Sequence, residues 1–407
     1  MRFSFTKIFV ATGALSLGFA AQANRARVST MGTSDHVGFL SYAGSANASN
    51  GSLFYSDDYN FFHNPALLGK TNNGLYLEKG LSDGTSNVEP FGGYKNDFGN
   101  LLPGAQYAVF FNRAGGLPAQ ASAAGNRPID IYFSMPVSDM NFGLGLTYAS
   151  ATTVNPTVPV AAATEAKFST SALKAVIGAS LMDAEVFIDY LATGKVRTSF
   201  NDATARSDGK VSNLGVGAKY NVAGWKPFLG YRSLKVQLEN TAAPAAGAIN
   251  PKVSLWGLGV GRTVEMNARA RFNMAASYWT STSNQIVTWD ANGDAAVTAT
   301  DVSDVITRRL GVDLNVEGNA NTWLVLRSGI THFLVDQTKG NVEGTTFGSN
   351  LTDPTIRIGA GVKAETFDID WVFGVGNAAV SNQTNLDSTN LGVSSGLFSN
   401  ISLNVRM

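Results

Sequence analysis

The sequence predicts an all-β protein, a transmembrane antiparallel up-and-down β-barrel of 16 strands, with 14 strands as the alternative. Three observations predict this fold. The N-terminus looks like a secretion signal, and the chain is poor in charged residues for its length. Apolar and polar residues alternate in segments about as long as a membrane-crossing strand, and the connections between segments are short and long in turn.

Residues 1–23 are expected to be a signal peptide that is cleaved after Ala23. Arg2 and Lys7 supply positive charge, residues 8–20 form an uncharged apolar run, and Ala21-Gln22-Ala23 is a small-residue cleavage site. An uncleaved membrane anchor is the alternative, which the shortness of the run disfavours. Together with the barrel prediction, this signal places the chain in the outer membrane of a Gram-negative bacterium.

The composition suits a chain whose outer surface meets lipid. Charged residues make up 15% of the chain and Gly supplies 43 of 407 residues, whereas a soluble domain has about 25% charged residues. After the signal, no stretch approaches the roughly 18 consecutive apolar residues of a spanning helix. The absence of cysteine excludes disulfides and thiol catalysis, and a formal net charge of zero argues against nucleic acid as a partner.

The clearest pair of strands spans residues 354–377. Apolar side chains occupy every second position in residues 354–364 and again in 367–377, and only Glu365 and Thr366 separate the two runs. Because side chains on a strand point to alternate faces, each run has one apolar face and one polar or glycine face. The short link predicts an antiparallel hairpin.

Fourteen further segments follow the same rule, the first two of them weakly. They are residues 74–79, 90–97, 105–112, 129–137, 141–150, 167–181, 184–197, 210–222, 226–238, 252–262, 267–279, 307–317, 323–335 and 401–407. Within 226–238 the apolar positions change from odd (Leu229, Tyr231) to even (Leu234, Val236), which predicts a β-bulge between them.

The connections indicate a membrane barrel more strongly than any single strand does. Short links near 138–140, 182–183, 223–224, 263–266, 318–320 and 365–366 alternate with long polar links at 113–128, 151–166, 199–209, 239–251, 281–302, 336–353 and 378–396. Short periplasmic turns and long extracellular loops are typical of outer-membrane barrels. A soluble sandwich or propeller is the alternative, and it has no reason to keep this alternation.

The polar faces of the strands should line a water-filled lumen, because a closed ring of 14–16 strands is wide enough for an aqueous channel. The charged residues expected to line the pore are Arg269, Arg271, Arg309, Asp313, Arg327, Arg357, Lys363, Asp368 and Asp370. Their mixed signs predict a weak ion preference.

Residues 24–72 do not alternate and precede the predicted barrel domain, residues 73–407. They contain an acidic pair, an aromatic-rich stretch and then Asn64-Pro65-Ala66. This run, SDDYNFFHNPALLGK, resembles the N-terminal segment of outer-membrane proteins related to the long-chain fatty-acid transporter (FadL) family. The resemblance implies a hatch that plugs the lumen and a transporter of hydrophobic substrates. A periplasmic extension, or a short helix capping the barrel floor, is the alternative.

Taken as a whole, the chain resembles general-diffusion porins of the outer membrane in its topology, its signal peptide and its C-terminal strand. That resemblance implies passive diffusion of small hydrophilic solutes and ions, with the lipid bilayer and the barrel-assembly machinery as partners, and a homotrimer or a monomer as the assembly. Met407 departs from the aromatic residue that usually ends such proteins. A structural or surface-interaction barrel is a third reading.

One loop motif indicates a candidate calcium site. Residues 290–301 place oxygen-bearing residues at the spacing of a 12-residue calcium loop and resemble the loop of dockerin-type repeats. The candidate Ca²⁺ ligands are Asp290, Asn292, Asp294, Thr298 and Asp301, with the carbonyl of Ala296. Ala295 stands where such loops carry Gly, and a solvated acidic loop is the alternative.

No catalytic constellation is present in the sequence. The three histidines, His36, His63 and His332, are scattered, and no nucleophile-elbow, zinc-protease or phosphate-loop motif occurs. We therefore expect no enzymatic activity and no required cofactor.

Overall fold

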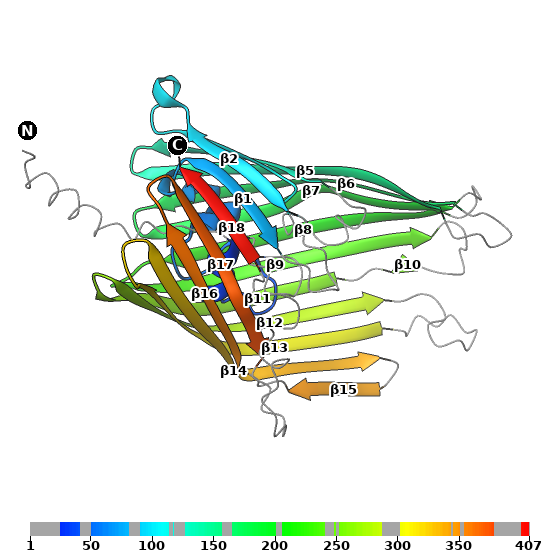
Figure 1. The fold of residues 1–407 in the computed structure, drawn as a ribbon. Coiled ribbons are helices and arrows are strands. Elements are labelled where there is room, and N and C mark those ends of the chain that lie inside the picture. Colours follow the sequence, from blue (N-terminus) through cyan, green and yellow to red (C-terminus); the bar gives the residue numbers. More distant parts are fainter. Residues whose placement is uncertain are drawn as a thin grey trace, which may run out of the picture.

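In the computed structural model, described for residues 25–40, 50–80, 90–113, 117, 127–156, 165–200, 206–240, 248–249, 252–286, 302–342, 345–350, 354–377 and 400–406, one antiparallel sheet closes on itself (Figure 1). Its strands are β1 (Gly74–Gly80), β2 (Phe91–Asp97), β3 (Gln106–Phe111), β4 (Ile129–Val137), β5 (Met140–Pro156), β6 (Glu165–Leu181), β7 (Ala184–Phe200), β8 (Arg206–Tyr220), β9 (Trp225–Asn240), β10 (Ala248–Ile249), β11 (Lys252–Asn267), β12 (Ala270–Ile286), β13 (Val302–Asn319), β14 (Leu324–Val342), β15 (Thr345–Asn350), β16 (Thr355–Lys363), β17 (Phe367–Asn377) and β18 (Asn400–Arg406).

Sixteen of these strands form the wall. β10 pairs only with β9 and β15 only with β14, while β9 also pairs with β11 and β14 with β16. The ring closes at β1, whose residues pair with β2 on one side and β18 on the other. The predicted closed 16-strand barrel is therefore confirmed. The two weakly predicted strands, β1 and β2, complete the ring.

The short turns gather at one rim. β4 and β5 are joined at 138–139, β6 and β7 at 182–183, and β8 and β9 at 221–224, and β1 begins and β18 ends at the same rim. In the last of these turns Ala223 and Gly224 both have positive φ, which a tight two-residue link requires. Wall strands β5–β9 and β11–β14 are 15–19 residues long. They exceed the roughly 9–11 residues that cross a membrane, so they extend beyond it at the long-loop rim.

The two faces of the wall differ as the alternation predicts. On β5, Phe142, Leu144, Leu146 and Tyr148 point outward and are 40–54% exposed, while the residues between them are buried. Similar outward rows occur on other wall strands, for example Leu214 and Val216 on β8. A continuous exposed apolar surface of this size is stable only against lipid.

The bulge predicted in residues 226–238 is wrong. β9 pairs with β8 and β11 in continuous register through this segment. Leu229 and Tyr231 face outward, whereas Leu234 and Val236 are buried inside the barrel. The change of parity marks apolar side chains that face the lumen, so a switch in alternation need not mark a bulge.

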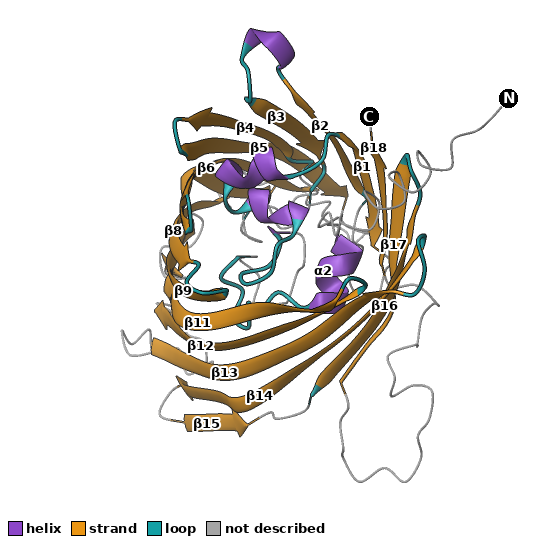
Figure 2. Cartoon of the chain, turned by 90° about the vertical axis from the view of Figure 1, so that its left-hand side faces the viewer, coloured by secondary structure: helices purple, strands orange, loops and turns teal. Residues whose placement is uncertain are grey.

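The described part of the chain also contains four short helices, namely α2 (Arg25–Met31), η2 (Asp58–Phe62), η3 (Pro65–Lys70) and η4 (Gly99–Leu101). Pro65 lies at the first turn of η3, where its missing N–H costs nothing, and Asn64 caps the helix through the N–H of Ala66. Figure 2 shows α2 enclosed by the strands, whereas the helix in the connection between β2 and β3, η4, projects beyond the rim. Among the described residues, no helix is long and apolar enough to span a membrane.

Candidate functional site: the occupied lumen

The lumen is occupied by residues 25–40 and 50–72, here called the inner segment. α2 contacts β14, β16, β17 and β18, and η3 contacts β3, β4, β5 and β6. Between these contacts, Tyr59 donates a hydrogen bond to Glu78 on β1, and Trp279 on β12 donates one to the carbonyl of Ser34 at 3.2 Å. The inner segment therefore meets the wall around its circumference.

Glycines in the wall let the inner segment approach closely. A Cβ atom at Gly143 on β5 would overlap the backbone of Pro65 and Ala66, and one at Gly359 on β16 would overlap the Thr30 side chain. Side chains at these positions would push η3 or α2 away from the wall. The glycines on the polar face of the strands thus provide space for the inner segment.

A buried ion cluster joins α2 to the wall near the short-turn rim. Arg27 donates from Nη1 to Asp57 Oδ2 at 2.6 Å and from Nε to Glu317 Oε2 at 2.7 Å. Glu317 also accepts from Arg327 Nε at 2.6 Å and from Arg271, and Arg327 pairs with Asp370. Three guanidinium groups thus face three carboxylates, so the formal charges of the cluster cancel.

Burial and neighbouring charges shift the pKa values of Arg27 and Asp57, the two members of this cluster that belong to the inner segment. Burial tends to lower the pKa of Arg27, but the carboxylates of Glu317 and Asp57 outweigh it and hold that pKa above its ordinary value. Burial raises the pKa of Asp57 to about 6, although Arg27 acts in the opposite direction. Both groups are ionised at neutral pH, so the pair between them is intact.

A second polar anchor lies around His36. Its Nε2 is 3.3 Å from Asp313 Oδ2, and its carbonyl accepts from Arg309 Nη1 at 2.5 Å. Arg309 also pairs with Asp336 at 3.0 Å, while Arg357 donates to Thr331 Oγ1 at 2.8 Å. This anchor binds the inner segment to β13 and links β13, β14 and β16 to one another.

Two apolar clusters also pack the inner segment against the wall. In the first, Tyr59, Phe61, Phe62, Leu67 and Leu68 pack against wall residues that include Phe110 and Tyr132. In the second, Val37, Phe39, Leu40, Leu53 and Phe54 pack against Phe187, Phe228, Leu255 and Trp279. His63 lies beside Phe187, and burial lowers its pKa to about 4, so the ring is neutral at pH 7.

A third apolar cluster lies nearer the long-loop rim. It consists of inward residues of β5–β9 together with Leu117, and its members are Leu117, Ala149, Ala172, Leu191, Val211, Leu234 and Val236. All are at most 7% exposed. The lumen face is therefore apolar on this side, above a polar layer that contains the Arg232–Asp189 pair.

Eight of the nine residues expected to line the pore lie on wall strands. Arg271, Arg309, Arg327, Asp368 and Asp370 take part in ion pairs, Asp313 lies 3.3 Å from His36 Nε2, Arg357 bonds to Thr331, and Lys363 lies partly buried at the end of β16. Arg269 is exposed in the turn between β11 and β12, away from the wall face. Most of these charges are thus engaged with each other or with the inner segment.

Two cations that shape the lumen were not singled out from the sequence. Arg27 pairs with Asp57 and Glu317, and Arg232 pairs with Asp189. Glu317 and Asp189 occupy polar positions in the alternation of their strands, and this pattern indicated that they face the lumen. Nothing in the sequence marked their cationic partners, since Arg27 and Glu317 are 290 positions apart.

The candidate calcium loop, residues 290–301, and the candidate signal peptide, residues 1–23, lie outside the described residues. Within the described ranges, no group of three His, Cys, Asp or Glu side chains is placed to hold a metal ion.

Comparison with known proteins gives likeness in fold alone. No family model matches the chain, and no curated sequence does. Similar solved structures include CdiB from Acinetobacter baumannii, with 9% identity, a TM-score of 0.41, and coverage of 83% of this chain and 60% of that one. A FadL homologue from Pseudomonas aeruginosa has 12% identity, a TM-score of 0.38 and coverage of 93% and 99%.

The toluene transporter TodX from Pseudomonas putida is similar at 11% identity and a TM-score of 0.34, with coverage of 90% of this chain and 95% of that one. These neighbours are outer-membrane barrels. The chain spans about 60% of the length of the CdiB structures that it matches.

Proposed function

We propose that this protein is an outer-membrane transport barrel that the inner segment closes as a plug. The proposal rests on the contacts between the inner segment and the wall. The inner segment contacts wall strands around the circumference through ion pairs, close approaches at glycines and apolar clusters. Transport then requires the plug to shift, or a solute to pass between plug and wall. The proposal includes two expectations from the sequence, namely that residues 24–72 form the plug and that they resemble the N-terminal segment of FadL-type transporters.

The substrate class that we propose is small apolar solutes. The inward apolar cluster on β5–β9 supports this choice, because a lumen built only to conduct water and ions has no use for Leu191, Val211, Leu234 and Val236 on its inner face. Leu117 packs against this cluster, so a solute entering from the long-loop rim would contact these side chains once that cover shifts, before it reaches the plug. No catalytic step is part of this function.

A diffusion porin for hydrophilic solutes and ions is the second candidate. A ring of 16 strands is wide enough to hold an aqueous channel, and the inner face carries charges of both signs. The two candidates differ in one respect that can be measured, since a porin conducts without any movement of the inner segment.

A reversible disulfide cross-link between the plug and the wall tests the proposal. Ser402 Oγ on β18 accepts a hydrogen bond from the N–H of Ala26 at 3.3 Å, and the chain contains no cysteine. The pair Ala26→Cys and Ser402→Cys, closed by oxidation or by a short thiol-bridging reagent, would fix the plug to the wall. Uptake of a fluorescent apolar dye by cells should stop when the bridge forms and return on reduction. Each single variant is the control, and unchanged uptake in the bridged protein would exclude a moving plug.

A further inference from the structure

A band of four lysines lies on the outer face of the barrel toward the long-loop rim. Lys195 on β7 stands directly opposite Lys210 on β8, and Lys235 on β9 stands directly opposite Lys252 on β11. Lys210 pairs with Gln237, so Lys235 is its diagonal neighbour on β9. All four side chains are exposed, and none forms an ion pair within the part of the chain that the structure describes.

The band has a defined height above the membrane-facing surface. Leu214, Tyr231 and Trp256 are the last large apolar side chains that face outward on β8, β9 and β11, and the lysine follows four residues beyond each of them. Four residues correspond to about 13 Å along a strand and, at the usual tilt, to about 10 Å along the barrel axis. Lysine side chains bend toward the interface, so their ammonium groups reach the level of the lipid headgroups.

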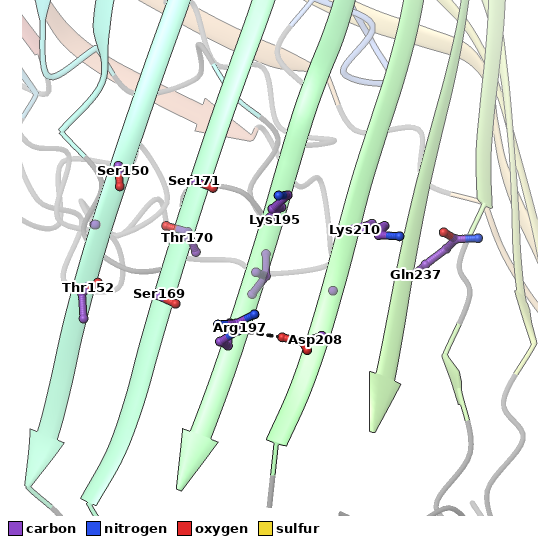
Figure 3. A pocket seen from close by; sticks show the side chains of 13 residues that line it. Ser150, Thr152, Ser169, Thr170, Ser171, Lys195, Arg197, Asp208, Lys210 and Gln237 are labelled. Atoms are coloured by element: carbon purple, nitrogen blue, oxygen red, sulfur yellow. Dashed lines mark hydrogen bonds and ion pairs between the residues drawn. The ribbon is translucent and has the colours of Figure 1, made fainter. Parts of the chain in front are cut away.

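Directly opposed like charges destabilise a pair of strands unless a counter-ion lies between them. On this face Asp208 on β8 binds Arg197 at 2.8 Å (Figure 3), and Glu239 on β9 stands directly opposite Asp208. Neither residue is directly opposite a lysine of the band, so the two opposed lysine pairs would be stabilised by anionic groups supplied from outside the chain.

The surface beside Lys195 and Lys210 adds hydrogen-bonding groups. A hollow of about 650 Å³ is lined by these two lysines, Ser150, Thr152, Ser171 and Gln237 (Figure 3). Hydroxyl and amide groups next to cations suit a ligand that carries sugar hydroxyls as well as phosphate.

We propose that the band formed by Lys195, Lys210, Lys235 and Lys252 binds the headgroup of a phosphorylated glycolipid in the membrane leaflet next to the long-loop rim. The two lysine pairs match two phosphate groups, and the hollow receives the sugar. Basic clusters at the membrane surface bind anionic headgroups in this way. The site rests on the outer-membrane placement of the barrel and is independent of what passes through the lumen.

Lipid titration of the full chain in lipid-free detergent tests the site. Lipid A, a glucosamine disaccharide with two phosphates, is the probe, and complexes are counted by native mass spectrometry. The affinity should fall about 30-fold in the Lys195→Gln/Lys210→Gln variant, at roughly fivefold per lysine. Dephosphorylated lipid A should bind the wild type more weakly than lipid A binds that variant, because it lacks the phosphates that all four lysines would contact. The matched control is Arg308→Gln, an exposed outer-face cation on β13 that faces Thr280 and Gln337 and should change the affinity less than twofold.

Thermal unfolding gives a second readout, in which removing the lysines should not lower the unfolding temperature of the lipid-free protein. Without lipid, the double variant should unfold at the same temperature as the wild type or a higher one, because a like-charge pair is gone. Added lipid A should stabilise the wild type and leave the variant unchanged. A double variant that does not fold is replaced by the two single variants.

Equal lipid A affinity in wild type and double variant overturns the site. Equal affinity for phosphatidylglycerol overturns the glycolipid assignment, and displacement of lipid A by millimolar inorganic phosphate shows that free phosphate is the ligand. Apolar-dye uptake should be unchanged in the lysine variant, so failure of the lipid site and failure of the transport proposal are separate results.

Discussion

Removing the charge of Glu317 should release the plug. In Glu317→Gln, three buried guanidinium groups face only the carboxylates of Asp57 and Asp370, so the cluster gains an uncompensated positive charge. Breaking a buried ion pair by removing one partner costs about 3–5 kcal/mol. We take about 3 kcal/mol, because Arg27 keeps Asp57, and this value corresponds to a rise of about 100-fold in the ratio of unseated to seated plug.

Single-channel recording in planar bilayers measures this ratio. Glu317→Gln should show open events far more often than wild type, with the conductance of each event unchanged. The matched control is Asp368→Asn, which removes the same kind of charge from a pair with Arg406 that joins wall strands β17 and β18 without involving the inner segment. If both variants leave the open probability at the wild-type value, the ion cluster does not hold the plug.

Three further perturbations test other parts of the structure. Gly143→Ala should unseat η3 and raise the open probability, because its Cβ would overlap Pro65 and Ala66, whereas Gly318→Ala, whose Cβ has its nearest neighbour at 3.8 Å, should leave recordings unchanged. The buried neutral His63 should weaken seating as pH falls from 6.5 toward 4, because the released ring binds a proton that the seated ring excludes. Asp57 acts in the opposite sense between pH about 6 and 3.8 and nearly offsets this effect, so the open probability of wild type should change little, whereas that of His63→Asn should fall as the pH is lowered. Ile358→Lys, at an outward position that is 53% exposed, should cost about 2–4 kcal/mol against lipid and reduce the folded, heat-modifiable barrel seen by gel shift, whereas Ile358→Leu should not.

The wall was predictable because its signal is local. Alternation at period two, the positions of short turns and the membrane length of each segment are properties of neighbouring residues, and they located all sixteen wall strands. The added strands β10 and β15 were not predicted. They are hairpin extensions beyond the membrane, where no lipid imposes an apolar face.

The interior was predictable only in part, because it depends on contacts between distant residues. Polar positions such as Asp313 and Arg327 were assigned to the inner face, yet alternation cannot tell whether a lumen charge meets water or another charge. Leu234 and Val236 were misread because an apolar inward side chain breaks the expected pattern. The cleavage site at Ala23 and the calcium loop at 290–301 stay predictions.

The conductance of the purified wild-type protein tests the central claim most directly. If the inner segment closes the lumen, planar bilayers containing the wild type should show no steady conductance, only brief openings, and the Ala26→Cys/Ser402→Cys bridge should abolish those openings until it is reduced. A stable open conductance that the bridge does not change would contradict the plugged barrel and favour the diffusion porin.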